Sequence, residues 1–219
     1  MAGFLALPVT TPAPGVVVLQ EIFGVNEAMR DKARRFADVG FVTLVPDLFW
    51  RQDPRVELGY GEPDRQRGFA LMQGFDFAAG VKDIVAAARW LEDFADSTGS
   101  IGVAGFCLGG KLAVAASRAY RFGAIASLYG VRLDDDLDAL RAIEVPFQFH
   151  VGDRDAHIPK TSVDAVRAAL LGMPNAEVLV YSGAQHGFYN AARSDVFDAA
   201  AAGLAQERLV RMFKTALAT

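Results

Sequence analysis

The chain contains very little cysteine: Cys107 is the only one in 219 residues. One cysteine excludes an internal disulfide and the cysteine clusters that bind zinc or iron–sulfur centres, and it fits a reducing compartment. The chain also lacks any run of basic residues, and its net charge is −4. Because a nucleic-acid-binding surface needs clustered Lys and Arg, we expect no nucleic-acid partner.

Charge is also missing from the start of the chain. No Lys or Arg precedes Arg30, and Pro8, Pro12 and Pro14 interrupt the apolar residues there. A signal peptide needs a basic start and an unbroken apolar core, and a membrane span needs about 20 apolar residues. Neither pattern is present, so we expect a cytoplasmic protein with no membrane partner.

Hydrophobic residues, by contrast, make up 52% of the chain and include 16 Phe, enough for a sizeable core. Short apolar runs alternate with helical patterns. The runs expected to form strands are 15–20, 41–46, 100–106, 124–130, 146–152 and 176–183. The stretches expected to form helices are 26–40, 75–95, 109–120, 161–172 and about 195–218. This alternation predicts one α/β domain over 1–219, a three-layer sandwich with a mostly parallel sheet and helices on both faces.

One segment breaks the alternation. Residues 49–68, "FWRQDPRVELGYGEPDRQRG", hold two prolines and many charges, and we expect a long surface excursion there. Loops of that length in a compact domain are usually functional or disordered. In an open parallel sheet, ligands bind beyond the carboxyl ends of the strands, so the residues just after each predicted strand are the candidates for chemistry.

Cys107 lies in such a position, in "GFCLGG" (105–110) between a predicted strand and a predicted helix. Gly105 and Gly109 stand two residues before and after it, as in the strand–turn–helix motif G-x-nucleophile-x-G. The N–H groups and dipole at the start of the helix favour a thiolate. A buried core cysteine and a redox thiol are the alternatives, although a redox thiol has no second cysteine to resolve it. The context favours a nucleophile.

A cysteine nucleophile needs a base, and the base needs a group that orients it. His150 lies inside a predicted strand, where a packed ring is expected, and His157 follows that strand. His186, in "SGAQHGFYN" after the last predicted strand, is the favoured base. Since folds with this motif run nucleophile, acid, histidine, the acid is Asp153 or Asp155 in "VGDRDAHIP", and we favour Asp155.

These motifs together resemble a known family. "GFCLGG", "VGDRDAHIP" and "GAQHGF" are similar to an α/β-hydrolase with Cys in place of the usual Ser. "QEIFGVN" (20–26), "PDLF" (46–49) and "MQGFDFAAGVKDI" (72–84) resemble the dienelactone hydrolases, or carboxymethylenebutenolidases. The likeness covers nearly the whole chain. It implies the α/β-hydrolase fold and hydrolysis of esters or lactones, with no cofactor and no metal.

The resemblance also implies roles around Cys107. In the family, the Glu that corresponds to Glu21 contacts the resting thiol, and substrate binding moves it so that it takes the thiol proton. The thiolate then exists mainly with substrate bound, so we expect the free enzyme to be alkylated slowly. The backbone N–H groups of Leu108 and Ile22 correspond to the family's oxyanion hole, where a donor lowers the barrier by about 3–4 kcal/mol.

The family also grips a substrate carboxylate with two arginines. Arg65 corresponds to the first, with Arg67 as a close alternative, and Asn190 stands where the second is found. An Asn can hydrogen-bond a carboxylate but lacks the charge and fork of Arg. Three further positions near the expected pocket differ from the family: Phe69, Met72 and Leu128. We expect Arg65, Phe69 and Asn190 to bind substrate in a more apolar, less anion-specific pocket.

The sequence therefore predicts a cysteine-dependent hydrolase of small esters or lactones that forms a thioacyl-enzyme. Cys107, His186, Asp155 and Glu21 are its predicted catalytic residues. The alternatives are a broad carboxylesterase or thioesterase of the same fold and a non-catalytic redox-sensing module. The complete set of four residues argues against the redox module. A monomer is the default expectation.

Overall fold

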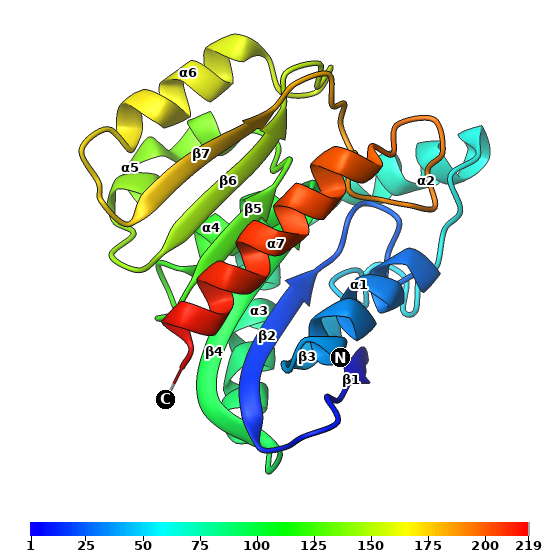
Figure 1. Cartoon of the computed structure of the whole chain (residues 1–219). Helices are drawn as coiled ribbons and strands as arrows, with labels where there is room; N and C mark the ends of the chain where they lie inside the picture. Colours follow the sequence, from blue (N-terminus) through cyan, green and yellow to red (C-terminus); the bar gives the residue numbers. More distant parts are fainter. Residues whose placement is uncertain (219) are drawn as a thin grey trace.

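A mixed β-sheet forms the centre of the molecule (Figure 1). In the computed structural model, which describes residues 1–218, its seven strands run in the order β1-β3-β2-β4-β5-β6-β7. β1 pairs antiparallel with β3, and the other neighbours are parallel. The strands are β1 (Gly3–Ala6), β2 (Ala13–Leu19), β3 (Val42–Pro46), β4 (Ser97–Phe106), β5 (Ile125–Leu128), β6 (Phe147–Gly152) and β7 (Ala176–Tyr181). The mostly parallel sheet predicted from the sequence is confirmed.

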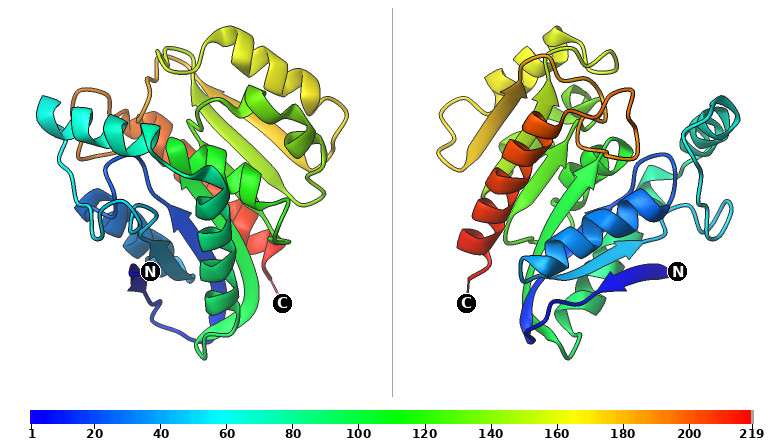
Figure 2. Two further views of the ribbon diagram at one scale, coloured as in Figure 1. Left: turned by 180° about the vertical axis from the view of Figure 1, so that it is seen from behind. Right: turned by 45° about the vertical axis from the view of Figure 1, so that its right-hand side comes forward.

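Helices cover both faces of this sheet. α1 (Glu27–Asp38) and α7 (Ala199–Ala216) lie on the face turned towards the viewer in Figure 1. The view from behind in Figure 2 shows the helices of the other face, and a 3₁₀ helix (Leu133–Asp136) precedes α5 there. These helices are α3 (Phe77–Glu92), α4 (Leu108–Ala116), α5 (Leu137–Arg141) and α6 (Lys160–Ala169). The predicted three-layer α/β sandwich is therefore confirmed.

The central strands are apolar because both of their faces are covered. Val16, Val17 and Val18 of β2 are fully buried, as expected for β-branched residues in a parallel sheet. On the α7 face, Phe36 and Phe213 meet edge to face with their ring centroids 5.9 Å apart. Each such buried side chain stabilises the fold by roughly 1.5–3 kcal/mol. This packing gives the strand ends a rigid support.

Four elements were not predicted: β1, α2 (Glu62–Gln73), the 3₁₀ helix and α5. β1 has only four residues on a sheet edge, and the 3₁₀ helix and α5 are also too short to show a clear pattern. α2 overlaps residues 62–68 of the segment that we expected to be a surface excursion and continues beyond it. Of its residues only Gly68 is buried, against Ile22, so α2 lacks the apolar stripe by which a surface helix is usually detected.

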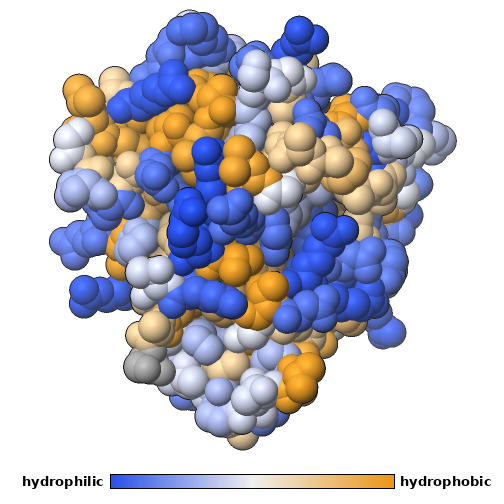
Figure 3. Space-filling model, viewed as in Figure 1, coloured by the Kyte–Doolittle hydropathy of each residue, from blue (hydrophilic) through white to orange (hydrophobic). Residues whose placement is uncertain are grey.

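The surface of the molecule carries both hydrophobic and hydrophilic residues. On the face that carries α1 and α7, hydrophobic patches are separated by charged residues (Figure 3). Within residues 1–218, no helix combines the length and the apolar character needed to cross a membrane.

Candidate active site

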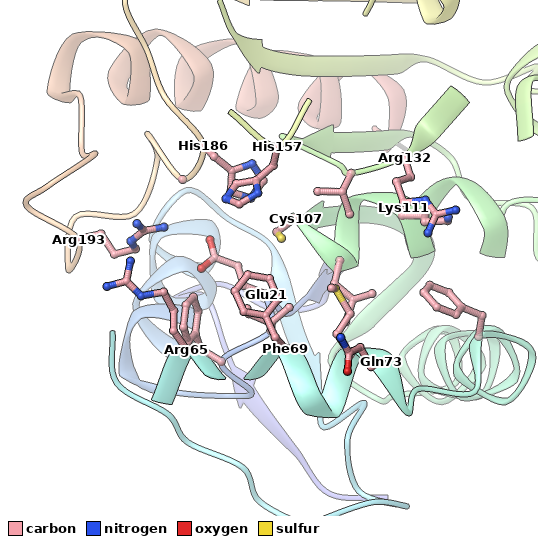
Figure 4. A pocket seen from close by; sticks show the side chains of 17 residues that line it. Glu21, Arg65, Phe69, Gln73, Cys107, Lys111, Arg132, His157, His186 and Arg193 are labelled. Carbon is pink, nitrogen blue, oxygen red and sulfur yellow. The ribbon is translucent and has the colours of Figure 1, made fainter. Parts of the chain in front are cut away.

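The turn between β4 and α4 holds Cys107 in a backbone conformation that few non-glycine residues adopt. Its φ is 53° and its ψ is −113°. Such a conformation costs about 1–3 kcal/mol and is concentrated at functional sites. A Cβ on Gly105 would collide with the Gly109 carbonyl, and a Cβ on Gly109 would lie 2.5 Å from the Leu19 carbonyl oxygen. Both glycines are therefore required for the turn that projects the thiol into a cavity (Figure 4).

His186 and Asp155 meet from two loops at the same end of the sheet. The ring Nδ1 lies 2.8 Å from Asp155 Oδ2, and the Asp155 side chain is fully buried. The other carboxylate oxygen accepts the backbone N–H of His157 over 2.8 Å, which fixes the orientation of the carboxylate. Asp153, the alternative acid, accepts the N–H of Gly183 on an exposed turn. Of the two candidate acids, only Asp155 contacts His186.

Two neighbours determine the charge of His186. Burial alone would lower its pKa, but the nearby Cys107 and the hydrogen-bonded Asp155 outweigh burial and raise the pKa to about 10. His157 packs edge-on against His186 with ring centroids 4.7 Å apart. Its own pKa is lowered by burial and by the charge of His186, so the two rings have opposite tendencies to bind a proton.

Glu21 lines the cavity together with Cys107, but its hydrogen bonds go elsewhere. The residue is 4% exposed. Its Oε1 accepts the Tyr129 hydroxyl over 2.7 Å, and its Oε2 accepts Asn190 Nδ2 over 3.2 Å. The resemblance implied that this carboxylate contacts the thiol, whereas its hydrogen-bond partners here are Tyr129 and Asn190. The carboxylate is thus anchored by two neutral donors.

Two backbone N–H groups are free at the cavity wall. Leu108 begins α4, Ile22 follows Glu21 in the chain, and both residues line the cavity. Neither N–H donates a hydrogen bond to another described residue. The two segments are tied together because the Gly109 N–H donates to the Gln20 carbonyl over 3.1 Å. Free donors beside a nucleophile are what an oxyanion hole requires.

The cavity that contains these groups has a volume of about 660 Å³, which suits a small-molecule substrate. One wall is α2, which contributes Arg65, Phe69, Met72 and Gln73. Phe69 lies where it was expected and is 39% exposed. The segment expected to be a surface excursion therefore leads into a helix that bounds the cavity.

Two guanidinium groups share one end of the cavity (Figure 4). Arg65 comes from α2, and Arg193 comes from the loop between β7 and α7. The Nε of Arg65 has no hydrogen-bond partner among the residues described, and Arg193 pairs with Asp195 at 3.0 Å. Arg67, the alternative considered from the sequence, is instead paired with Asp53 and does not line the cavity.

Asn190 does not line this cavity in the structure, and its contact with substrate stays a prediction. The residue is 1% exposed, and its amide donates to Glu21 and to the Tyr60 hydroxyl. Two consecutive turns explain the difference, since Asn190 N–H bonds to the Gly187 carbonyl and Arg193 N–H to the Asn190 carbonyl. They bury Asn190 behind Glu21 and bring Arg193 to the cavity. The cavity is thus lined by three arginines, Arg65, Arg132 and Arg193, of which Arg132 pairs with Asp135 at 2.9 Å.

Comparison with known proteins places the chain in a family. The model of the dienelactone hydrolase family matches residues 1–217. The chain belongs to the dienelactone hydrolase family. It is 37% identical over 203 residues to a carboxymethylenebutenolidase of Pseudomonas putida, covering 92% of this chain and 85% of the relative. It is 36% identical over 157 residues to carboxymethylenebutenolidase 1 of Cupriavidus pinatubonensis, covering 71% and 67%.

A solved structure supports the same assignment. A protein of Klebsiella pneumoniae assigned as a dienelactone hydrolase superposes with a TM-score of 0.83 at 28% identity, over 96% of this chain and 91% of that one. The resemblance and the α/β-hydrolase fold predicted from the sequence are thus confirmed. As a member of the dienelactone hydrolase family, the chain is a hydrolase of lactone or ester bonds.

Some residues at the site of this dienelactone hydrolase were missed in the sequence. Tyr129 directly follows β5, but the strand predicted over 124–130 includes it, so the rule that places ligands at strand ends passed over it. No local signal distinguishes Arg193. His150, inside β6, is a packed core residue bonded to Tyr181 over 2.8 Å, as expected. In the part of the chain that is described, no group of three or more His, Cys, Asp or Glu is placed to hold a metal ion.

Proposed function

We propose that this dienelactone hydrolase family member hydrolyses small lactones or esters with Cys107 as the nucleophile. His186 serves as acid and base, and Asp155 orients it. One arrangement carries the proposal: Cys107 and His186 line the same cavity, which is large enough for a small molecule, and the His186 ring is hydrogen-bonded to Asp155. Such a nucleophile–base–orienter series is the pattern of acyl transfer.

The first half of the reaction forms a thioacyl-enzyme. The Cys107 thiolate attacks the carbonyl carbon, an Sγ–C bond forms, and the carbonyl π electrons move to the oxygen. The N–H groups of Leu108 and Ile22 hold that oxyanion, worth about 3–4 kcal/mol for a donor. The intermediate collapses with cleavage of the C–O bond, and the leaving alkoxide or enolate takes a proton from His186. In a lactone this step opens the ring.

The second half releases the acid. Neutral His186, held by Asp155, removes a proton from water as the water attacks the thioester carbonyl. The second oxyanion collapses with cleavage of the Sγ–C bond, and Cys107 leaves as thiolate. The net reaction is ester plus water to acid plus alcohol. Because a thiolate leaves a tetrahedral intermediate more readily than an amine does, esters and enol-lactones suit this nucleophile better than amides.

We further propose that Glu21 controls the thiol. A carboxylate near Cys107 opposes formation of the thiolate by like-charge repulsion and is a proton acceptor for the thiol once substrate binds. If so, Glu21→Gln raises the rate at which iodoacetamide labels Cys107 at pH 7, by about tenfold for 1.4 kcal/mol of repulsion relieved. The only cysteine makes the adduct unambiguous by intact mass. Glu27→Gln, an exposed charge on α1, is the control and should leave the rate unchanged.

We also propose that the substrate carries a carboxylate, held by Arg65 and Arg193. Two guanidinium groups at one end of a partly apolar cavity support this, because paired forks bind a carboxylate with charge and with direction. The relatives named carboxymethylenebutenolidase point to the same class of substrate. A small enol-lactone with one free carboxylate fits both the nucleophile and the charged end.

The deciding experiment compares kcat/KM on a carboxylate-bearing dienelactone with that on p-nitrophenyl acetate, for wild type and Cys107→Ala. We expect the wild type to prefer the dienelactone and the variant to lose turnover on both. A clear preference for the simple ester would favour a broad carboxylesterase instead. Unchanged turnover in Cys107→Ala would refute the nucleophile, and a wild type inactive on an ester panel would favour the redox-sensing module.

A further inference from the structure

A lysine is buried behind the active site. Lys32 lies in the middle of α1, is 4% exposed, and its Nζ has no hydrogen-bond partner among residues 1–218. It belongs to the buried stripe of α1 together with Met29, Ala33 and Phe36, where an apolar side chain would be expected. A lysine is almost never fully buried unless it is paired, so this position calls for a reason other than packing.

The Lys32 side chain points towards the catalytic turn. Its Nζ lies 5.1 Å from the ring centroid of Phe106, the residue that precedes Cys107. The Phe106 ring packs against Tyr129, with centroids 6.1 Å apart, and the Tyr129 hydroxyl donates to Glu21. Burial lowers the pKa of Lys32, and Glu21 is the charged group that most opposes this fall. Phe106 and Tyr129 thus form a packed aromatic layer between the ammonium and the carboxylate.

Glu21 has no other cation bound to it. Its donors, Tyr129 and Asn190, are neutral, and no ion pair within residues 1–218 includes its carboxylate. Burial favours the protonated form of a carboxylate, and each positive charge around it opposes that effect. The titratable side chains that surround Glu21 from the neighbouring elements are Tyr60, Arg65, Cys107, Tyr129, His186 and Arg193. Those beside Lys32 are Asp31, Arg35 and Tyr189.

We propose that Lys32 is a positioning residue for the reaction, whose ammonium keeps Glu21 ionised so that it is able to take the proton of Cys107. The inference rests on the role proposed above for Glu21. Solvent and salt screen a buried charge far less than an exposed one. The charge of Lys32 therefore acts on Glu21 more strongly than the charge of a surface lysine at the same distance would. An unpaired ammonium weakens the fold, and residues that weaken a fold are typically retained at functional sites.

The first test is the pH dependence of Lys32→Met, which keeps the length of the side chain and removes its charge. Without the ammonium, Glu21 takes a proton more readily. The acid limb of the pH profile of kcat/KM should then shift to higher pH by about one unit. At the low-pH end of this limb kcat/KM should fall by about tenfold, and at high pH it should equal that of wild type. Arg35→Met, which removes an exposed charge one turn along α1, should leave the limb in place.

Thermal denaturation separates this role from packing. Lys32→Met should unfold at the same temperature as wild type or higher, because it removes an unpaired buried charge. A lower unfolding temperature together with an equal loss of kcat/KM at every pH would mean that Lys32 is structural. An acid limb that stays in place in Lys32→Met would equally overturn the inference, while turnover by the wild type would leave the proposed function intact.

The second test needs no turnover. Iodoacetamide labelling of Cys107 at pH 7 is compared in wild type, Lys32→Met, Glu21→Gln and the double variant. Because Lys32 acts through the charge of Glu21, Lys32→Met should speed labelling only when Glu21 is present. The two proteins with Gln at position 21 should react at equal rates. An effect of Lys32→Met that persists without Glu21, or slower labelling in the single variant, would overturn the inference.

Discussion

The hydroxyl of Tyr129 donates a 2.7 Å hydrogen bond to Glu21, a residue 108 positions earlier in the chain. Tyr129 is fully buried, and its backbone φ of 39° turns the chain sharply just after β5. Burial, reinforced by the charge of Glu21, raises the pKa of Tyr129 well above its ordinary value. The phenol therefore remains a hydrogen-bond donor at neutral pH.

We predict that Tyr129→Phe lowers the free energy of unfolding by roughly 1–3 kcal/mol, because it leaves one oxygen of a buried carboxylate without a donor. Urea denaturation measures this directly. The control is Tyr120→Phe, since the Tyr120 hydroxyl donates to Glu92 over 3.1 Å at an exposed position. That change should stay within about 0.5 kcal/mol. Equal losses in the two variants would contradict the prediction.

The pH dependence of stability should reflect His186. Its folded-state pKa of about 10 lies above the ordinary value of 6.5, so the protonated ring stabilises the folded chain. This contribution is complete below pH 6.5 and is lost as the pH rises through 10. We expect the free energy of unfolding to fall between pH 7 and 10 in wild type, and to fall less in Cys107→Ala, where one of the two groups that raise the pKa is absent. Equal slopes in denaturation series would speak against it.

The two arginines should act on charged substrates only. Arg65→Met and Arg193→Met should each raise KM for a carboxylate-bearing lactone by roughly 10- to 100-fold, the range for a lost charged hydrogen bond. Turnover of neutral p-nitrophenyl acetate should be unaffected. Arg67→Met is the matched control, because Arg67 lies on the same helix but pairs with Asp53 outside the cavity. Parallel losses on both substrates would mean that the arginines support the fold instead.

The elbow glycines should be irreplaceable. In Gly105→Ala the new Cβ meets the backbone carbonyl of Gly109, which cannot move without breaking the turn, so we expect a loss of at least about 3 kcal/mol. Gly203→Ala in α7 is the control: no atom lies within 4 Å of its new Cβ, and the change should stabilise the helix by roughly 0.5–1 kcal/mol. Chemical denaturation of both variants decides the matter, and a stable, active Gly105→Ala would refute the steric argument.

The fold was readable from the sequence because its signals are local. Each buried strand is a short apolar run, and each amphipathic helix repeats apolar residues on one face, so five of the helices and the parallel strands were expected near their actual positions. α2 was missed because only Gly68 is buried, while Leu71 and Met72 are only partly buried, so the helix shows no clear apolar stripe. α5 was missed because five residues are too few to show a helical pattern.

Some residues of the candidate site could likewise be predicted from the sequence, and others could not. Cys107, Asp155 and His186 stand in turns whose residue types follow from short-range backbone geometry, so their positions could be predicted from a few neighbouring letters. Arg193 lines the cavity and Asn190 does not. This arrangement depends on two successive turns and on the hydrogen bond from Asn190 to Glu21, which lies 169 residues away along the chain. Lys32 reads as an ordinary charge on a helix until the packing of α1 buries it. Local sequence patterns thus determined the fold and the candidate reactive residues. Contacts between distant segments decided which charged side chains surround those residues, because burial and charge balance exist only once the chain is folded.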